Sequence, residues 1–252
     1  MKKNNSPLVS IITPTYNSEK FISKTIISIL NQTYTNWELL ITDDCSDDST
    51  IKVINSYVKN EKRIKLFILK NNSGAGVARN NSIFHSQGKY IAFCDADDQW
   101  LPNKLKTQID FMNKNNLQFT YSSYNICNEN DDLIGKVISP KVISYRKMLN
   151  NNYVGCLTAI YDAEKIGKLY MSKIRNRQDW TLWFKILKKT GPTKGIVEPL
   201  AIYRNRRTSI SSSKMKQLKY NWMVYNKELG YNIILSTLLM INFLIYYAAK
   251  KI

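Results

Sequence analysis

Short apolar runs alternate with helical patterns over the first part of the chain, and this alternation limits the possible folds more than any other feature. The runs are rich in β-branched and aromatic residues and cover residues 8–13, 37–42, 64–69 and 90–94. After the first run, Ile22, Ile26 and Ile29 recur at the spacing of one helix face. Strands that alternate with helices predict an α/β fold, with a mostly parallel sheet flanked by helices on both faces.

Local signals place further elements along the chain. Ser18 is a candidate cap for a helix beginning at Glu19, and a second helix is expected from about Thr50 to Val58. In the second half, we expect strands at residues 118–124 and 155–161, a polar loop at residues 128–144, and helices around residues 105–112 and 176–189.

Polar loops follow three of the first four predicted strands. They cover residues 14–17, 43–48 and 95–98. In open parallel sheets, ligands bind at the carboxyl ends of the strands, and these ends meet at one edge. The three loops together therefore predict a ligand site at that edge of the sheet.

The loop at residues 95–98 holds three carboxylates in four residues, Asp95, Asp97 and Asp98. Like charges this close are unfavourable unless a cation or a set of hydrogen-bond donors compensates them, so a hard divalent metal ion is the natural partner. The alternative is an acidic turn in which Asp98 or Asn103 caps the helix that opens after Pro102. Capping alone requires only one such residue.

The chain of 252 residues has a formal net charge of +18, from 37 Lys and Arg against 19 Asp and Glu. This excess implies an anionic partner: nucleic acid, an anionic membrane surface or a phosphorylated small molecule. A nucleic-acid-binding module is not expected, because the chain has no recognisable binding motif and no aromatic platform with interleaved basic residues. The acid clusters at this sheet edge would also repel a phosphate backbone unless a metal ion were present.

The four cysteines are widely spaced, at positions 45, 94, 127 and 156, and His85 is the single histidine. This spacing argues against a zinc site and against a disulfide framework. The first seven residues are polar and lack the apolar core of a signal peptide. We therefore expect the protein to stay in the reducing cytosol.

The C-terminal part of the chain differs in kind from the rest. Residues 231–249 are strongly apolar, with basic residues on both sides, and Asn232, Ser236 and Asn242 are among the polar residues that interrupt the run. Three structures remain open: a helix lying in the interface of an anionic membrane, a helix docked on the globular domain, and a true membrane span. The polar interruptions and the basic flanks favour the interfacial helix.

Four motifs stand in a recognisable order: residues 9–17, the acidic loop 43–50, residues 72–80 and the run 95–98. With them the chain resembles the family 2 glycosyltransferases of the GT-A fold, which move a sugar from a nucleotide donor to an acceptor. A fainter resemblance extends to about Lys214 and is similar to bacterial enzymes of capsule, teichuronic acid and O-antigen assembly. Cys45 replaces a usual glycine, and Gln178-Asp179 replaces a common Glu-Asp pair.

The resemblance implies roles for the residues of the four motifs. Asp97 and Asp98 would hold Mn2+ or Mg2+, and Asp95 would contact the ribose or the ion through water. Asp43 and Asp44 look like base-reading acids, and because a carboxylate accepts from uracil N3–H, a UDP-linked donor is favoured. The implied nucleotide-sugar site consists of Pro14, Thr15, Tyr16, Asn17, Asp43, Asp44, Gly74, Arg79, Asp95, Ala96, Asp97 and Arg204.

Structural alternatives stay open for several of these residues. The alternative role for Asp43 and Asp44 is that one of them caps the following helix. Asp47 or Ser49 is a candidate for that cap instead. Tyr16 would stack on the base or belong to the core. Arg79 would fork onto phosphate or the base, or be a solvated helix charge, and Arg204 and Arg206 would lie over the diphosphate or form a basic surface.

Asp179 is the candidate catalytic base by its family position. It would accept the proton of the acceptor hydroxyl as that oxygen attacks C1 on the face opposite the diphosphate, which inverts the anomeric centre. Such a base works better when apolar neighbours raise its pKa, and Trp180 and Trp183 are close in sequence. The alternative is a carboxylate in the first turn of a helix that interacts with the helix dipole.

The expected organisation is a GT-A domain at residues 1–212, with a nucleotide-sugar-binding half at 1–115 and an acceptor and catalytic-base half at 116–212, and a helical tail at 213–252. The expected function is metal-dependent, inverting transfer from a UDP-sugar to a glycan or polyprenyl-diphosphate-linked acceptor in cell-surface polysaccharide biosynthesis. The expected location is cytoplasmic, peripheral on the inner face of the cell membrane. The alternative is a catalytically degenerate GT-A scaffold of a polysaccharide-assembly complex.

Overall fold

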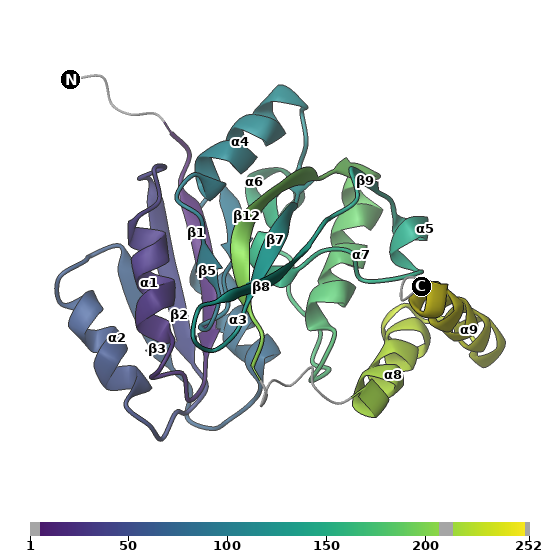
Figure 1. Cartoon of the computed structure of the whole chain (residues 1–252), viewed down its shortest axis with the longest axis horizontal. Coiled ribbons are helices and arrows are strands. Elements are labelled where there is room, and N and C mark those ends of the chain that lie inside the picture. Colours follow the sequence, from purple (N-terminus) through teal and green to yellow (C-terminus); the bar gives the residue numbers. More distant parts are fainter. Residues whose placement is uncertain (1–5, 207–213, 250–252) are drawn as a thin grey trace.

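A six-stranded sheet lies at the centre of the computed structural model, which describes residues 6–206 and 214–249 (Figure 1). Five of its strands run in the same direction, and only β10 runs antiparallel, to its neighbours β4 and β6. The spatial order is β3 (Ile64–Ile68), β2 (Trp37–Asp43), β1 (Val9–Thr15), β4 (Tyr90–Phe93), β10 (Ile160–Asp162) and β6 (Phe119–Thr120). The predicted mostly parallel α/β sheet is confirmed.

Helices cover both faces of this sheet because alternate strand residues face opposite sides. Ile11 packs in one buried cluster with residues of α1 (Ile22–Leu30) and α4 (Lys104–Lys114). Ile12 packs in the other cluster with residues of α3 (Ala75–His85) and α7 (Gln178–Thr190). The helix α2 (Thr50–Val58) has the predicted bounds.

A second sheet stands beside the first and has the strand order β5 (Gln99–Trp100), β12 (Ile196–Arg204), β7 (Ser122–Cys127) and β8 (Leu133–Val137). The strand β8 and the strand β9 (Val142–Ile143), which pairs with β11 (Thr193–Lys194), lie where a loop was predicted, so that prediction was wrong. The residues of β8 are mostly exposed, so the sequence shows no alternation of apolar and polar residues there. The strand forms because its backbone pairs with β7.

Two other local predictions were wrong. The first helix begins at Ile22 and not at Glu19, because Ser18 O accepts hydrogen bonds from the N–H groups of Phe21 and Ile22 in a preceding turn. The predicted strand at residues 155–161 begins with the 3-10 helix η1 (Cys156–Thr158), and only β10 is extended. The Thr158 N–H and hydroxyl both bond to Gly155 O, which closes the η1 turn.

The C-terminal part forms the helix α8 (Lys214–Met223), the π-helical turn η2 (Val224–Glu228) and the helix α9 (Ile233–Ala249). Figure 1 shows α8 and α9 at one end of the molecule, near the short helix α5 (Tyr145–Met148) and far from α1 and α2. The remaining short helix is α6 (Ala163–Ile166). The predicted boundary between residues 212 and 213 lies outside the described residues, as do residues 209–213 of the fainter resemblance.

One side of α9 is docked on the domain, because Phe243 is buried against the Trp180 ring and Asn242 bonds to Asn150. The other side carries exposed apolar side chains, with Ile234 at 74% exposure. Within residues 6–206 and 214–249, no helix combines the length and the apolar character that crossing a bilayer requires.

Candidate active site

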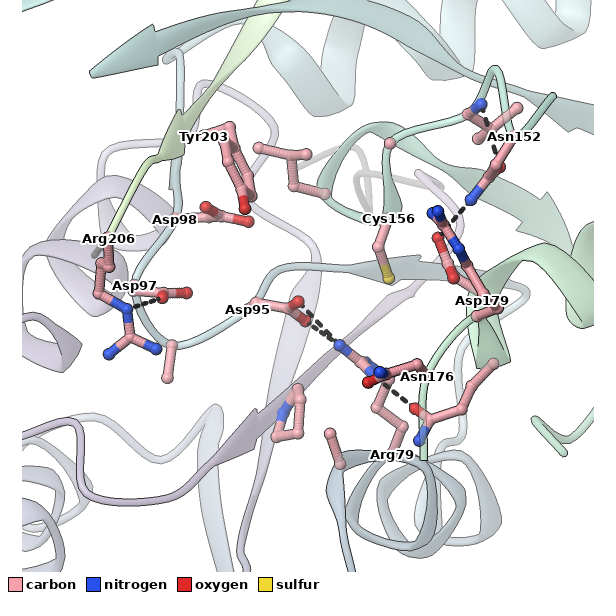
Figure 2. A pocket seen from close by; sticks show the side chains of 18 of the residues that line it. Arg79, Asp95, Asp97, Asp98, Asn152, Cys156, Asn176, Asp179, Tyr203 and Arg206 are labelled. Carbon is pink, nitrogen blue, oxygen red and sulfur yellow. Dashed lines mark hydrogen bonds and ion pairs between the residues drawn. The ribbon is translucent and has the colours of Figure 1, made fainter. Parts of the chain in front are cut away.

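A pocket of about 910 Å3 opens at the carboxyl ends of the parallel strands, where the polar loops were expected to meet. Most of the predicted site residues line it: Pro14, Thr15, Tyr16, Asn17, Asp44, Gly74, Arg79, Asp95, Ala96, Asp97, Asp98 and Asp179. Asp43 and Arg204 do not. In Figure 2, Asp97 and Arg206 lie on one side of the pocket, Asp179 and Asn152 on the other, and Asp95 between them.

The acidic run forms a turn, closed by a hydrogen bond of 3.0 Å from the Asp98 N–H to Asp95 O. The hydroxyl of Thr25 on α1 lies 2.9 Å from Ala96 O and 2.7 Å from Asp98 O. Strand β12 adds a further anchor, since the Arg204 N–H donates to Asp98 Oδ1 at 3.0 Å. The turn is therefore held on two sides, and its carboxylates are fixed in the pocket.

Asp97 and Asp98 place two carboxylates side by side, and among the described residues only Asp97 forms an ion pair, with Arg206. Burial raises the pKa of Asp98 well above its usual range, and the charges of Asp97 and Asp95 raise it further. Burial also raises the pKa of Asp97, although Arg206 Nε, at 2.7 Å from Asp97 Oδ2, opposes this. A divalent cation would stabilise both ionised carboxylates.

The chemistry of these donors fits a hard divalent ion. Such ions are often held by one or two carboxylates, with water and substrate phosphates completing the coordination. No cluster of three or more His, Cys, Asp or Glu suited to hold a metal occurs among the described residues. The pair Asp97 and Asp98 therefore matches a site that substrate phosphates complete, and it does not match a closed protein cage.

Arg79 on α3 is buried and pairs with Asp95 at the end of β4. Its Nη2 lies 2.6 and 2.7 Å from the two Asp95 carboxylate oxygens, and its Nη1 donates to Gln178 Oε1 at 3.1 Å. Burial disfavours the charged guanidinium, but the Asp95 charge outweighs this and the pKa of Arg79 is raised. Arg79 is thus not a solvated helix charge, and its guanidinium lines the pocket while paired with Asp95.

Asp179 lies in the first turn of α7 and faces the pocket. Asn152 Nδ2 donates to its Oδ2 at 2.8 Å. Trp180 and Trp183, the apolar neighbours in sequence, are fully buried in the core behind it. Asn152 orients this carboxylate toward the pocket, and its place in the first turn of α7 is compatible with a catalytic role.

Asp43 and Asp44 make different contacts. Asp43 is fully buried and accepts hydrogen bonds from the N–H and the hydroxyl of Ser46. Asp44 lines the pocket and accepts from the N–H groups of Ser73 and Gly74, at 2.8 and 2.7 Å. Neither of them caps α2, because the N-cap position is Ser49, whose side chain makes no capping hydrogen bond, and the Thr50 N–H donates to Asp48 Oδ1.

Tyr16 and Arg204 also differ in position. Tyr16 lies at the pocket with 46% exposure, so it does not belong to the core. Arg204 is 1% exposed, and its guanidinium bonds to Asn128 O, Asp97 O and the Asp131 carboxylate. Two residues farther along, Arg206 reaches the pocket. Sequence adjacency did not distinguish the two arginines, because the guanidinium partners of Arg204 come from the distant segments 97 and 128–131.

Sequence reasoning missed several pocket residues, among them Asn152, Tyr124 and Tyr203. Asn152 lies in the polar run 150–152, and no local spacing connects it with Asp179. Only the packing of residues 149–154 between α7 and α9 brings the amide to the carboxylate.

Comparison with known proteins gives one family and several relatives. The model of the family "Glycosyl transferase family 2" matches residues 10–187. A putative teichuronic acid biosynthesis glycosyltransferase, TuaG of Bacillus subtilis, is 41% identical over 225 residues, 89% of each chain. The protein WfgD of Escherichia coli, named as a UDP-Glc:alpha-D-GlcNAc-diphosphoundecaprenol beta-1,3-glucosyltransferase, is 42% identical over 221 residues, 86% of this chain and 85% of its own.

Solved structures share the fold at low identity. TarS of S. aureus (residues 1–349, with UDP-GlcNAc) has a TM-score of 0.70 and 18% identity, covering 97% of this chain and 73% of its own. The mannosyltransferase PcManGT of Pyrobaculum calidifontis, in complex with GDP-Man and Mn2+, has a TM-score of 0.68 and 15% identity, covering 98% and 75%.

Proposed function

The chain belongs to glycosyl transferase family 2 and has the GT-A fold, and on this premise we propose that it moves a sugar from a UDP-linked donor to a polyprenyl-diphosphate-linked glycan, with inversion, in cell-surface polysaccharide biosynthesis. The observation that carries the proposal is that Asp97, Asp98 and Asp179 line one pocket. The name of WfgD supports the class of acceptor and the donor nucleotide, and the name of TuaG supports polysaccharide biosynthesis.

At the donor end, Asp97 and Asp98 are the residues that would hold Mn2+ or Mg2+. When bound, such an ion acts as a Lewis acid on the diphosphate oxygens. The raised pKa of Asp98, caused first by burial and then by Asp97, supports this assignment, since it shows that the site gains from added positive charge. Arg206 is close enough to contribute a second positive charge at the same end.

The nucleotide occupies the part of the pocket lined by Pro14, Thr15, Tyr16, Asn17 and Asp44. The exposed ring of Tyr16 is available to stack on the base. Asp44 keeps acceptor capacity beyond its two backbone hydrogen bonds, because a carboxylate offers about four acceptor positions. Asp43 stabilises the loop at residues 43–48 by accepting a hydrogen bond from the Ser46 hydroxyl. The N–H of Gly74 donates to Asp44, which fixes the turn before α3.

At the other end, Asp179 takes the proton of the acceptor hydroxyl. Asn152 fixes the carboxylate, so that one oxygen accepts from the amide and the other is available for the hydroxyl. The attacking oxygen forms its bond to C1 while the bond from C1 to the diphosphate oxygen breaks on the opposite face, which inverts the anomeric centre. A positioned base of this type contributes about 100- to 10,000-fold to the rate.

The tail is proposed to hold the protein on the inner face of the cell membrane. The exposed apolar side of α9 and the net charge of +18 support an anionic lipid surface as its partner. We also propose that the chain consists of a GT-A domain at residues 1–212 and a membrane-binding tail at residues 213–252.

The test measures UDP release from UDP-sugars with Mn2+ and a diphosphate-linked acceptor. Asp98→Asn keeps an oxygen that accepts from the Arg204 N–H but removes the negative charge. This variant should lose UDP release and also the Mn2+-dependent thermal shift with UDP. Asp179→Asn should keep the thermal shift and lose transfer. Asp110→Asn, a change on the exposed side of α4, is the control and should behave as wild type.

Two outcomes would count against the proposal. If Asp98→Asn retains the Mn2+-dependent shift and full release, the metal assignment is wrong. If the folded wild-type protein binds UDP but releases none from any donor and acceptor tested, the chain is a degenerate scaffold.

A further inference from the structure

The pocket carries positive charge at both ends, and the two ends differ in how that charge is balanced. Four arginines line it. Arg79 pairs with Asp95, and Arg206 pairs with Asp97. Neither Arg175 nor Arg177 takes part in an ion pair among the described residues. The end of the pocket near Asp179 therefore holds guanidinium charge without a carboxylate in direct contact.

Arg177 is held in place by neutral partners. Its Nε donates to Asn221 Oδ1 at 2.8 Å and its Nη2 to Gln217 Oε1 at 2.9 Å, both on α8. Its Nη1 has no hydrogen-bond partner in the part of the chain that the structure describes. Amide partners orient a guanidinium without neutralising it, so the charge stays available to a ligand.

The backbone of Arg177 supports a functional role for this side chain. Its φ is +66°, in the left-handed region, which costs a residue with a side chain about 1 to 2 kcal/mol. Such conformations persist where the surroundings enforce them, and they cluster at ligand sites. Burial lowers the pKa of Arg177 more than the charge of the nearby Asp179 raises it, so its guanidinium remains poorly solvated and only partly balanced.

We propose that Arg175 and Arg177 bind the diphosphate of the acceptor, in a subsite separate from the metal end that takes the donor's diphosphate. This inference rests on the proposed function. In a diphosphate-linked acceptor, one sugar ring separates the reacting hydroxyl from the diphosphate. With the hydroxyl at Asp179, the diphosphate therefore lies about one sugar ring away from that carboxylate. Arg177 is two residues before Asp179, and Asn176 lies beside Asp179 in Figure 2, away from Asp97 and Arg206.

The chemistry of the two ends matches two different diphosphates. The donor's diphosphate is a leaving group and needs the stronger stabilisation that a divalent ion gives. The acceptor's diphosphate does not react, so it only needs to be bound and oriented, which arginine forks do well. The helix α8, whose Gln217 and Asn221 side chains hold Arg177, continues through η2 into α9, which has an exposed apolar side suited to a lipid chain on that diphosphate.

The experiment compares two water-soluble acceptors with the full-length chain, a UDP-sugar donor and Mn2+. One is α-D-GlcNAc diphosphate with an undecyl tail, and the other is the neutral undecyl α-glycoside of the same sugar. Arg175→Gln and Arg177→Gln are each expected to raise the KM of the diphosphate acceptor about tenfold or more, with little change for the neutral glycoside. The thermal shift with UDP and Mn2+ should stay that of wild type.

Lys173→Gln is the matched control, because it removes one positive charge from an exposed side chain in the same segment that does not line the pocket. Arg175 is itself exposed, so Arg175→Gln keeps the test valid if Arg177→Gln disturbs the packing against α8. Equal effects on both acceptors, or an equal effect of Lys173→Gln, would overturn the subsite. Loss of transfer by the wild type with every donor would instead contradict the proposed function.

Discussion

Arg79 on α3 reaches both oxygens of the Asp95 carboxylate with one guanidinium nitrogen, at 2.6 and 2.7 Å, and its other terminal nitrogen donates to Gln178. Gln178 is the first residue of α7, and Asp179 is the second. One buried side chain thus joins the metal end of the pocket to the helix that carries the proposed base.

Replacing Arg79 by Lys keeps the charge but removes the planar fork, so one of the two contacts is lost. We expect the free energy of unfolding to fall by about 1 to 3 kcal/mol and the transfer rate to fall as well. Urea unfolding and initial rates measure the two effects. Arg63→Lys is the control, since Arg63 also pairs with a carboxylate, that of Glu61, but is partly exposed and does not line the pocket. An equal loss of stability in both variants would contradict a special role for Arg79.

Gly155 precedes η1 and lines the pocket, and a Cβ there would lie 2.8 Å from the Tyr124 ring and 3.2 Å from a Leu157 methyl. Gly155→Ala should displace the Tyr124 ring, lower stability by about 1 to 3 kcal/mol and slow transfer. Gly135→Ala on the exposed strand β8 is the comparison, because the nearest atom to its Cβ is 3.9 Å away. Thermal unfolding and transfer rates are measured for both variants. Similar values for the two would show that the close approach of residue 155 to the Tyr124 ring is unimportant.

Lys104 at the start of α4 is fully buried, and burial lowers its pKa from 10.5 to about 7. Between pH 7 and pH 10.5 the unfolded chain binds a proton here that the folded chain does not, so stability rises with pH in this window. From pH 7 to pH 8.5 the gain from this group is about 1 to 2 kcal/mol.

The variant Lys104→Met should lose this pH dependence, and Lys106→Met, an exposed lysine of the same helix, should keep it. Urea unfolding at a series of pH values from 6.5 to 8.5 gives the comparison. Parallel profiles for wild type and Lys104→Met would mean that Lys104 stays protonated in the folded protein throughout.

The apolar side of α9 should bind anionic lipid. Ile234 and Ile245 are 74% and 64% exposed, so replacing both by Ser should leave the melting temperature nearly unchanged. The affinity for phosphatidylglycerol vesicles, measured by co-sedimentation, should fall by about tenfold or more, because serine lacks the favourable free energy of burying an isoleucine side chain in lipid. Leu133→Ser on β8, also 64% exposed, is the control. Unchanged co-sedimentation of the double variant would place the lipid contact elsewhere on the basic surface.

Elements with a strong local pattern followed from the sequence almost residue by residue. The helix α2 and the strands β1, β2 and β4 are examples, because their apolar residues recur at the period of a helix or form a continuous buried run. The errors fall where pairing with a distant segment creates the element. The exposed strand β8 exists through β7, and residues 155–158 form a turn beneath the pocket.

By itself, the sequence determined the α/β class, the family resemblance and the gathering of the polar loops at one sheet edge, since these depend on local periodicity and on the rule that parallel strands end together. Only the tertiary structure decided what each charged side chain contacts. Arg79 turns to Asp95, Arg204 is buried while Arg206 lines the pocket, and Asn152 meets Asp179, because in each case the partner comes from a segment that is distant in sequence.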